Sequence, residues 1–139
     1  MKNIVVAYDS SASADQAFAF GLDLATHYGA ALHVLSVAQP PEPPSMVETE
    51  EMLEEYEAQY RESYPALKER ACEQGVEPRF EVRPGHPAEQ IVRYAEEVKA
   101  DVIVLGHRGH SHSFVDRWLV GSISKRVLTY AHCTVIVVR

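Results

Sequence analysis

The sequence predicts an α/β fold in which helices cover both faces of a five-stranded parallel sheet. Five short aliphatic runs alternate with four stretches of helical periodicity, and this alternation is typical of parallel strands joined by right-handed crossovers. The 139 residues are 46% apolar and 24% charged, which is the ordinary globular mix. No internal repeat or long linker divides the chain, so we expect one domain over residues 1–139.

The first predicted strand is Ile4–Tyr8, a β-branched run without alternation that is typical of a strand buried on both faces. The next stretch is helical, because its apolar residues recur every three or four positions. Ser13 with Gln16 three residues later matches a capping box at its start, and Gly29 suits its C-terminal cap. Leu32–Ala38 is the second predicted strand.

Four prolines within residues 39–44 exclude a helix or an inner strand, so this segment is predicted as a loop. The stretch from there to Gln74 is acidic and helical, and Gly75 should end it. Pro65 should kink this helix or begin a new segment. The face of this helix that should pack on the sheet carries a row of tyrosines: Tyr56, Tyr60 and Tyr64.

The third predicted strand is Arg79–Arg83. Pro87 is well placed as the first residue of the following helix, because proline needs no hydrogen-bond donor there. Val102–Leu105 is the fourth strand, Ser122 opens the last helix, and Thr134–Val138 is the fifth strand.

The net charge of −7 argues against a general polyanion binder, so we expect no nucleic-acid partner. The charge is unevenly distributed along the chain. Residues 1–98 hold seven basic and eighteen acidic side chains, whereas residues 99–139 hold six and two. A phosphate-bearing ligand should therefore bind in the C-terminal third.

The apolar run Ile4–Ala7 is too short for a signal peptide, and no aliphatic run is long enough for membrane insertion. Cys72 and Cys133 have neither the spacing of a disulfide framework nor that of a thiolate metal site, and both are interpreted as small core residues. We therefore expect a cytoplasmic protein.

Two predicted strands end in residues that suit a binding site. Asp9 follows the first strand and Gly106 ends the fourth, at the sheet edge where open parallel sheets bind ligands. The segment Gly106–Gly109 is followed, after eleven residues, by Gly121 and Ser122 at the start of a helix. Glycines let backbone amides approach an anion, and a helix N-terminus adds partial positive charge. The pattern predicts a phosphate chain between Gly109 and the start of this helix.

Over its whole length the chain resembles the universal stress protein family, in particular its ATP-binding branch. The resemblance rests on five segments, at residues 4–9, 32–37, 85–88, 100–109 and 121–139. It implies a Rossmann-like three-layer sandwich with strand order 3-2-1-4-5, bound ATP with Mg²⁺, and a homodimer formed through the strand at 134–139. One departure from the family's G-x2-G-x9-G-[ST] pattern is the spacer, which has eleven residues here instead of nine.

The resemblance also implies a role for each site residue. Asp9 and the backbone of Ala7 and Val37 would face the adenine, whereas Gly106, Arg108 and Gly109 would line the ribose and α-phosphate. Gly121, Ser122 and Ile123 would donate amides to the outer phosphates. The complete predicted set is Ala7, Tyr8, Asp9, Val37, Leu105, Gly106, His107, Arg108, Gly109, Gly121, Ser122, Ile123 and Ser124.

Simpler structural roles stand beside these assignments. Asp9 can cap the first helix or its turn, Gly106 and Gly109 can be turn residues, and Ser122 can cap the last helix as well as contact phosphate. Three histidines, His107, His110 and His112, have a spacing that could chelate a metal. No carboxylate or thiolate joins them in this loop, and we predict no metal site.

We expect a regulatory module of the stress response that responds to nucleotide and is not an enzyme, because no motif supplies a general base or an activated nucleophile. Two alternatives remain: a slow nucleotide hydrolase or transferase using the same pocket, and a dimeric interaction protein that binds no nucleotide. If the protein is such a nucleotide-responsive module, we also expect a protein partner, which the sequence does not identify.

Overall fold

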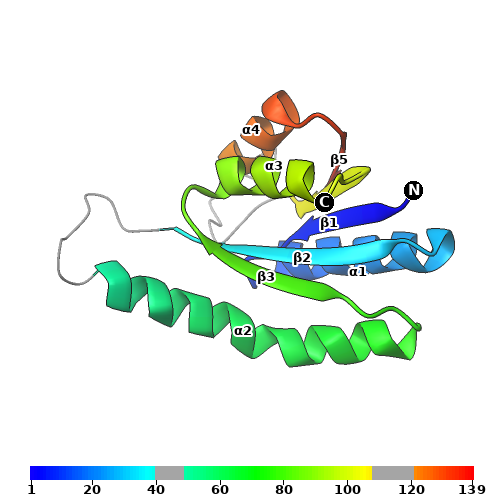
Figure 1. Ribbon diagram of the computed structural model, residues 1–139, viewed down its shortest axis with the longest axis horizontal. Coiled ribbons are helices and arrows are strands. Elements are labelled where there is room, and N and C mark those ends of the chain that lie inside the picture. Colours follow the sequence, from blue (N-terminus) through cyan, green and yellow to red (C-terminus); the bar gives the residue numbers. More distant parts are fainter. Residues whose placement is uncertain (40–48, 108–120) are drawn as a thin grey trace.

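Figure 1 shows the architecture of the computed structural model, which describes residues 1–39, 49–107 and 121–139. The elements in chain order are β1 (Asn3–Ala7), α1 (Ala12–Tyr28), β2 (Ala31–Ala38), α2 (Thr49–Glu73), β3 (Arg79–Pro84), α3 (Pro87–Glu97), β4 (Val102–Gly106), α4 (Ser122–Tyr130) and β5 (Thr134–Val138). The strands are parallel and lie in the order β3-β2-β1-β4-β5. Helices α1 and α2 cover one face of the sheet, and α3 and α4 cover the other. The predicted fold class and strand order are therefore confirmed.

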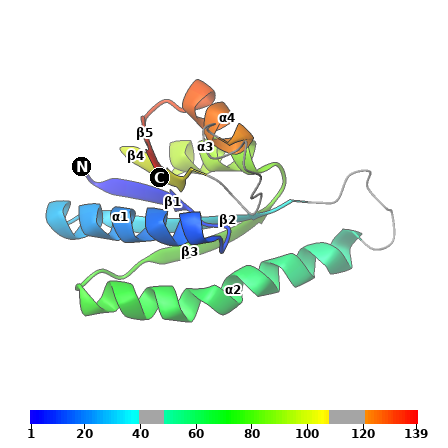
Figure 2. The same ribbon diagram turned by 180° about the vertical axis from the view of Figure 1, so that it is seen from behind.

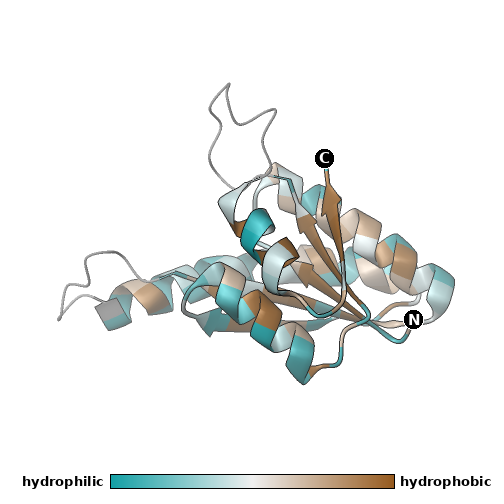
Figure 3. Ribbon diagram, turned by 90° about the horizontal axis from the view of Figure 1, so that it is seen from above, coloured by the Kyte–Doolittle hydropathy of each residue, from teal (hydrophilic) through white to brown (hydrophobic). Residues whose placement is uncertain are grey.

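The central strands form the middle layer of the core. Ile4, Val5 and Val6 are fully buried, and alternate residues of β1 face opposite sides of the sheet. Ile4 and Val6 pack against α1 and α2, whereas Val5 packs against α3 and α4. Figure 3 shows the apolar strands in brown beneath helices whose surfaces carry much teal. This two-sided burial explains why the first strand has no polar alternation.

Helix α1 begins two residues earlier than the predicted capping box. Its N-cap is Ser11, whose side chain accepts a hydrogen bond from the Ala14 amide at 3.1 Å. The assignment of the cap to Ser13 and Gln16 is therefore wrong, because the extended backbone at Ser11 already places a hydroxyl over the first turn. Gly29 ends the helix with φ of 62°, as predicted.

Helix α2 runs unbroken through Pro65, so this proline does not begin a new segment. Figure 2 shows α2 from behind, with its axis bending along its length. Pro65 lies on the exposed side of the helix. A backbone carbonyl that loses its partner to proline can hydrogen-bond to water on that side. The opposite face carries Tyr64 and Leu67 into the core.

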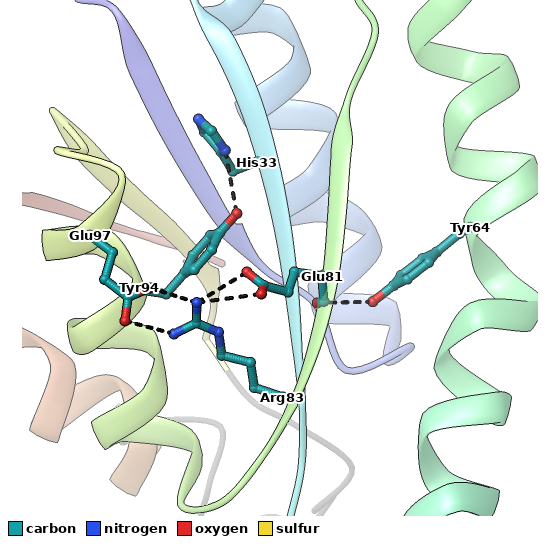
Figure 4. Close-up of polar contacts among 6 residues, drawn as sticks. All are labelled: His33, Tyr64, Glu81, Arg83, Tyr94 and Glu97. Carbon is teal, nitrogen blue, oxygen red and sulfur yellow. Dashed lines mark hydrogen bonds and ion pairs between the residues drawn. The ribbon is translucent and has the colours of Figure 1, made fainter.

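A polar network fastens α3 to the sheet (Figure 4). His33 of β2 is buried between Asn3 and Tyr94, with Nε2 lying 3.2 Å from Asn3 Oδ1 and Nδ1 lying 3.4 Å from the Tyr94 hydroxyl. The guanidinium of Arg83 lies 4.8 Å from the centre of the Tyr94 ring and donates to both carboxylate oxygens of Glu97. Figure 4 places Tyr64 on the opposite side of β3, where its side chain belongs to the core under α1 and α2.

Two smaller predictions need correction. Cys72 is exposed at the end of α2 and is not a core residue, whereas Cys133 is half-buried. Strands β2, β3 and β4 each extend one residue beyond the predicted runs, at Ala31, Pro84 and Gly106. None of the helices in the described part of the chain combines the length and the apolar character that a bilayer crossing requires.

Candidate functional site

The candidate site lies at the edge of the sheet where β1, β2 and β4 end. Strand β1 pairs with β2 on one side and with β4 on the other, so their carboxyl ends are neighbours. Backbone bonds extend the sheet past the strand ends: the Tyr8 amide donates to Leu35 O and the His107 amide donates to Val138 O, both at 2.8 Å. The strand order reverses at β1, which is the switch point where open α/β sheets bind ligands.

Asp9 opens the turn between β1 and α1. Its Oδ1 accepts a hydrogen bond from the Ser11 amide at 3.0 Å, the pattern of an Asx turn. The intervening Ser10 has φ of 68°, a left-handed conformation that is uncommon for residues other than glycine. Asp9 therefore caps the turn and not the helix, whose N-cap is Ser11. The half-buried Asp9 also lies at the predicted edge of the sheet.

Tyr8 turns its side chain away from this edge. The ring is buried in the core under α1 and α2, and its hydroxyl donates to Asp15 Oδ1 at 2.7 Å. Burial and the Asp15 carboxylate raise the pKa of Tyr8 above its usual value. Only the backbone of Tyr8 is left to line a site. Ala7 and Val37 are half-buried and belong to the other core, under α3 and α4.

Gly106 is required by packing between β4 and α1. A Cβ atom on Gly106 would lie 2.7 Å from the Ser13 carbonyl carbon and 2.8 Å from Ser13 Cβ, and closer still to Ser13 Oγ. Real Cβ atoms do not approach other heavy atoms so closely, and the nearest neighbours here include backbone. Close packing of β4 against α1 therefore requires a residue without a side chain at position 106, and the sequence pattern does not reveal this requirement.

Helix α4 begins beside the end of β4, at the predicted phosphate-binding position. Its N-cap is Gly121, and no side chain caps its first amides within the part of the chain that the structure describes. Ser122 is an exposed first helical residue, so its assignment as the helix cap is wrong: the extended backbone that precedes the helix belongs to Gly121. Ser124 is buried, and its hydroxyl donates to Gly106 O at 3.2 Å.

The start of α4 is thus tied to β4 by two hydrogen bonds, since the Gly121 amide also donates to His107 O at 3.3 Å. Ile123 is 37% exposed, whereas Leu105 and His107 are buried. Arg108, Gly109, His110 and His112 lie outside the described residues. Among those that are described, no group of three histidine, cysteine or acidic side chains could hold a metal ion.

Helix α2 contributes residues to this edge that the sequence analysis did not assign to the site. Ser63 Oγ lies 3.3 Å from Ser10 Oγ, which joins α2 to the turn after β1. Burial and the nearby charge of Asp9 raise the pKa of Tyr60. The tyrosine row was visible in the sequence, but it indicated only packing. Nothing in the sequence pattern placed Tyr60, the middle residue of this row, near Asp9.

The fold and this edge together define a class: a doubly wound α/β protein whose helix N-terminus is directed at the switch point of a parallel sheet. Comparison with known proteins narrows this class. The sequence profile of the Universal stress protein family matches residues 1–139. The chain therefore belongs to the universal stress protein family, as the sequence segments suggested.

A universal stress protein of Methanocaldococcus jannaschii is 33% identical, in an alignment covering 99% of this chain and 82% of that protein. The solved universal stress protein UspA from Lactobacillus plantarum has a TM-score of 0.90 at 28% identity and covers 99% of this chain and 97% of its own. A universal stress protein from Archaeoglobus fulgidus, solved in complex with dAMP, has a TM-score of 0.69 at 23% identity, with coverages of 100% and 98%. Other solved neighbours have cAMP or AMP bound.

Proposed function

We propose that this protein binds an adenine nucleotide, ATP in particular, and acts as a regulatory module of the stress response. The observation that carries the proposal is the start of α4, where no described side chain caps the amides beside the switch point. Solved neighbours with the same fold have cAMP, dAMP or AMP bound, so the adenine nucleotide is their common ligand class.

In the proposed complex, amides of Ser122, Ile123 and Ser124 donate to phosphate oxygens, because the first turn of a helix leaves these donors without intrahelical partners. Asp9 and the backbone of Ala7 and Val37 face the adenine. The remaining members of the predicted set are Leu105, Gly106, His107 and Gly121, together with Arg108 and Gly109 from outside the described residues. The buried Tyr8 ring and Ser124 hydroxyl support the walls of the site and do not contact nucleotide.

An accompanying Mg²⁺ ion would be held mainly by the phosphates and water, as is usual for this ion. Asp9 is the carboxylate at this edge that could add one ligand. We assign no catalytic residue, because no motif in the sequence supplies a base for activating water. The proposed output is a nucleotide-dependent change in the surface next to α4, which a partner protein would read.

The test is calorimetric titration of ATP, with Gly121→Val as the perturbing variant and Ser122→Ala as its control. A branched side chain at Gly121 would stand where phosphate oxygens must reach the amides, so binding should be lost. Ser122→Ala keeps the amide and should bind with wild-type affinity, because the exposed hydroxyl is not required. Wild-type affinity in a folded Gly121→Val protein would overturn the phosphate assignment.

We further propose a homodimer through β5, supported by the contrast between the two edges of the sheet. Edge strand β3 carries the charged residues Arg79, Glu81 and Arg83 and ends in Pro84, all of which discourage pairing with another strand. Edge strand β5 has the sequence TVIVV, which contains neither charge nor proline. An apolar edge without protection is expected to be covered, and a second copy about a two-fold axis would cover it.

A further inference from the structure

A groove lies between α3 and α4, on the outer side of the layer that these two helices form. Its volume is about 530 Å³, which is within the range of small-molecule sites in proteins. The two helices run beside each other in Figure 1, and the groove takes residues from both. Its lining combines apolar residues, Ala88 and Val92 on α3 and Tyr130 on α4, with charged side chains around the opening.

The four charged side chains that line this α3–α4 groove differ in their partners. Glu89 forms an ion pair with Arg93 at 2.8 Å, and Glu96 lies 3.0 Å from Nε2 of His132. Arg126 is different, since its Nη1 contacts His86 Nε2 at 2.7 Å. Among the described residues, no carboxylate lies within ion-pair distance of the Arg126 guanidinium. The groove therefore presents one cation that its described neighbours do not neutralise.

The contact with His86 does not remove the charge of Arg126. A guanidinium only donates hydrogen bonds, so Nε2 of His86 must be the acceptor and carries no proton. The imidazole is then neutral with its proton on Nδ1. It fixes the direction of the guanidinium while leaving its positive charge and several of its N–H donors available to a ligand.

The same lining limits the charge of that ligand. One uncompensated guanidinium matches one negative charge, and a planar carboxylate matches the fork of its N–H donors. A second negative charge on the ligand would meet the carboxylate of Glu96 on the α3 wall. The ring of Tyr130 is 67% exposed and Val92 is half-buried, so an apolar ligand body would remove both from water.

We propose that the α3–α4 groove binds a small organic acid, with its single carboxylate on Arg126 and its apolar body against Val92 and Tyr130. The proposal does not depend on nucleotide binding, because none of the groove residues belongs to the predicted nucleotide site. The groove and that site share only helix α4.

The experiment uses 4-phenylbutyrate as the probe and titrates it into the ¹⁵N-labelled protein without nucleotide. Amide shifts of α3 and α4 residues around the groove should move together and saturate. Arg126→Gln should weaken the affinity roughly tenfold or more, the size expected for losing a hydrogen-bonded charge pair. Lys125→Gln removes the neighbouring charge, which does not line the groove, and should leave the affinity unchanged.

Two related probes test the chemistry in the wild-type protein. 4-Phenylbutanol lacks the carboxylate and should bind much more weakly, and phenyl phosphate should also bind more weakly because its second charge meets Glu96. Equal affinity for the alcohol and the acid, equal loss in Arg126→Gln and Lys125→Gln, or shifts confined to other surfaces would each overturn the proposal. These measurements keep the question decidable if Arg126→Gln proves unstable.

Discussion

Gly106→Ala separates the packing role of this glycine from the binding role that the sequence pattern assigned to it. The added Cβ would lie 2.7 Å from the carbonyl carbon of Ser13, and this contact is with backbone, so no side-chain rotation relieves it. Over-packing of this kind costs about 1–3 kcal/mol. For a chain of 139 residues this corresponds to a melting temperature lower by roughly 3–9 °C.

The assay is urea unfolding of the wild type, Gly106→Ala and Gly121→Ala, with ATP titrations of the same three proteins. Gly121→Ala is the matched control, since its Cβ would lie 3.2 Å from His107 O, a less severe contact than those at Gly106, which asks for a shift of only a few tenths of an ångström. The double variant Ser13→Ala/Gly106→Ala should stay destabilised, because the backbone of Ser13 remains in the way. Unchanged stability of Gly106→Ala would refute the packing argument, and lost ATP affinity at full stability would show that binding alone requires this glycine.

Three further outcomes follow from the structure. Burial and the charge of Arg79 lower the pKa of His33 in the folded protein below 6.5. As the pH falls, His33 is therefore protonated in the unfolded chain before it is protonated in the folded protein. The contribution of neutral His33 to the free energy of unfolding should be complete above about pH 6.5. Below that pH the free energy of unfolding should decrease by at most about 1.4 kcal/mol per pH unit. Urea titrations should show a flatter pH dependence for His33→Gln, and a slope identical to that of the wild type would contradict this. The buried Tyr64 hydroxyl, whose pKa burial raises to about 12, donates to Ser36 Oγ at 2.7 Å; Tyr64→Phe should therefore cost about 1–2 kcal/mol in urea unfolding, and the loss should be much smaller in a Ser36→Ala background. Finally, Val137→Pro should abolish the proposed dimer in sedimentation experiments while Val137→Ala keeps it, and a wild-type monomer would exclude the dimer.

The choice of Val137 for the dimer test comes from the structure. Val138 O accepts the His107 amide, so the backbone of Val138 faces β4. Because backbone groups of successive strand residues point to alternate sides, Ile136 also faces β4 and Val137 faces the open edge. A proline at Ile136 would break a bond within the sheet and damage the fold itself. The sequence shows that β5 lacks charge, but it does not show which of its amides are exposed.

Most of the fold was predictable, because its signals are local and repeated. Continuous β-branched runs mark strands buried on both faces, and the helices between them show apolar residues at a spacing of three to four. The errors lie where two candidates stand close in sequence. Ser11 and Ser13 both precede α1, and only the backbone conformation decides which hydroxyl meets the first amides. Similarly, Cys72 follows the buried Ala71 by one position and is carried to the exposed side of α2.

The gathering of the candidate site residues at one edge of the sheet was predictable, but the contacts that each residue makes there were not. The edge formed by Asp9, Gly106 and Gly121 follows from the strand order and the glycine spacing. The directions of the side chains do not: Tyr8 turns into the core, and Ser124 bonds to the backbone of β4. The contribution of α2 through Ser63 could not be predicted either, because it depends on the docking of a helix distant in sequence.

The structural and functional interpretations of this edge are linked by the connection between β4 and α4. Gly106 allows α1 to pack closely against β4, and Ser124 then holds the start of α4 against the carbonyl of that same residue. Both contacts stabilise the fold, and together they place the first amides of α4 at the carboxyl end of the central strands. The geometry that the proposed phosphate site requires would therefore be built by residues that need not touch the phosphate. Among the described glycines of the pattern, Gly121 is the one whose replacement by valine tests binding most directly, because the described residues around it leave more room for a Cβ atom than those around Gly106.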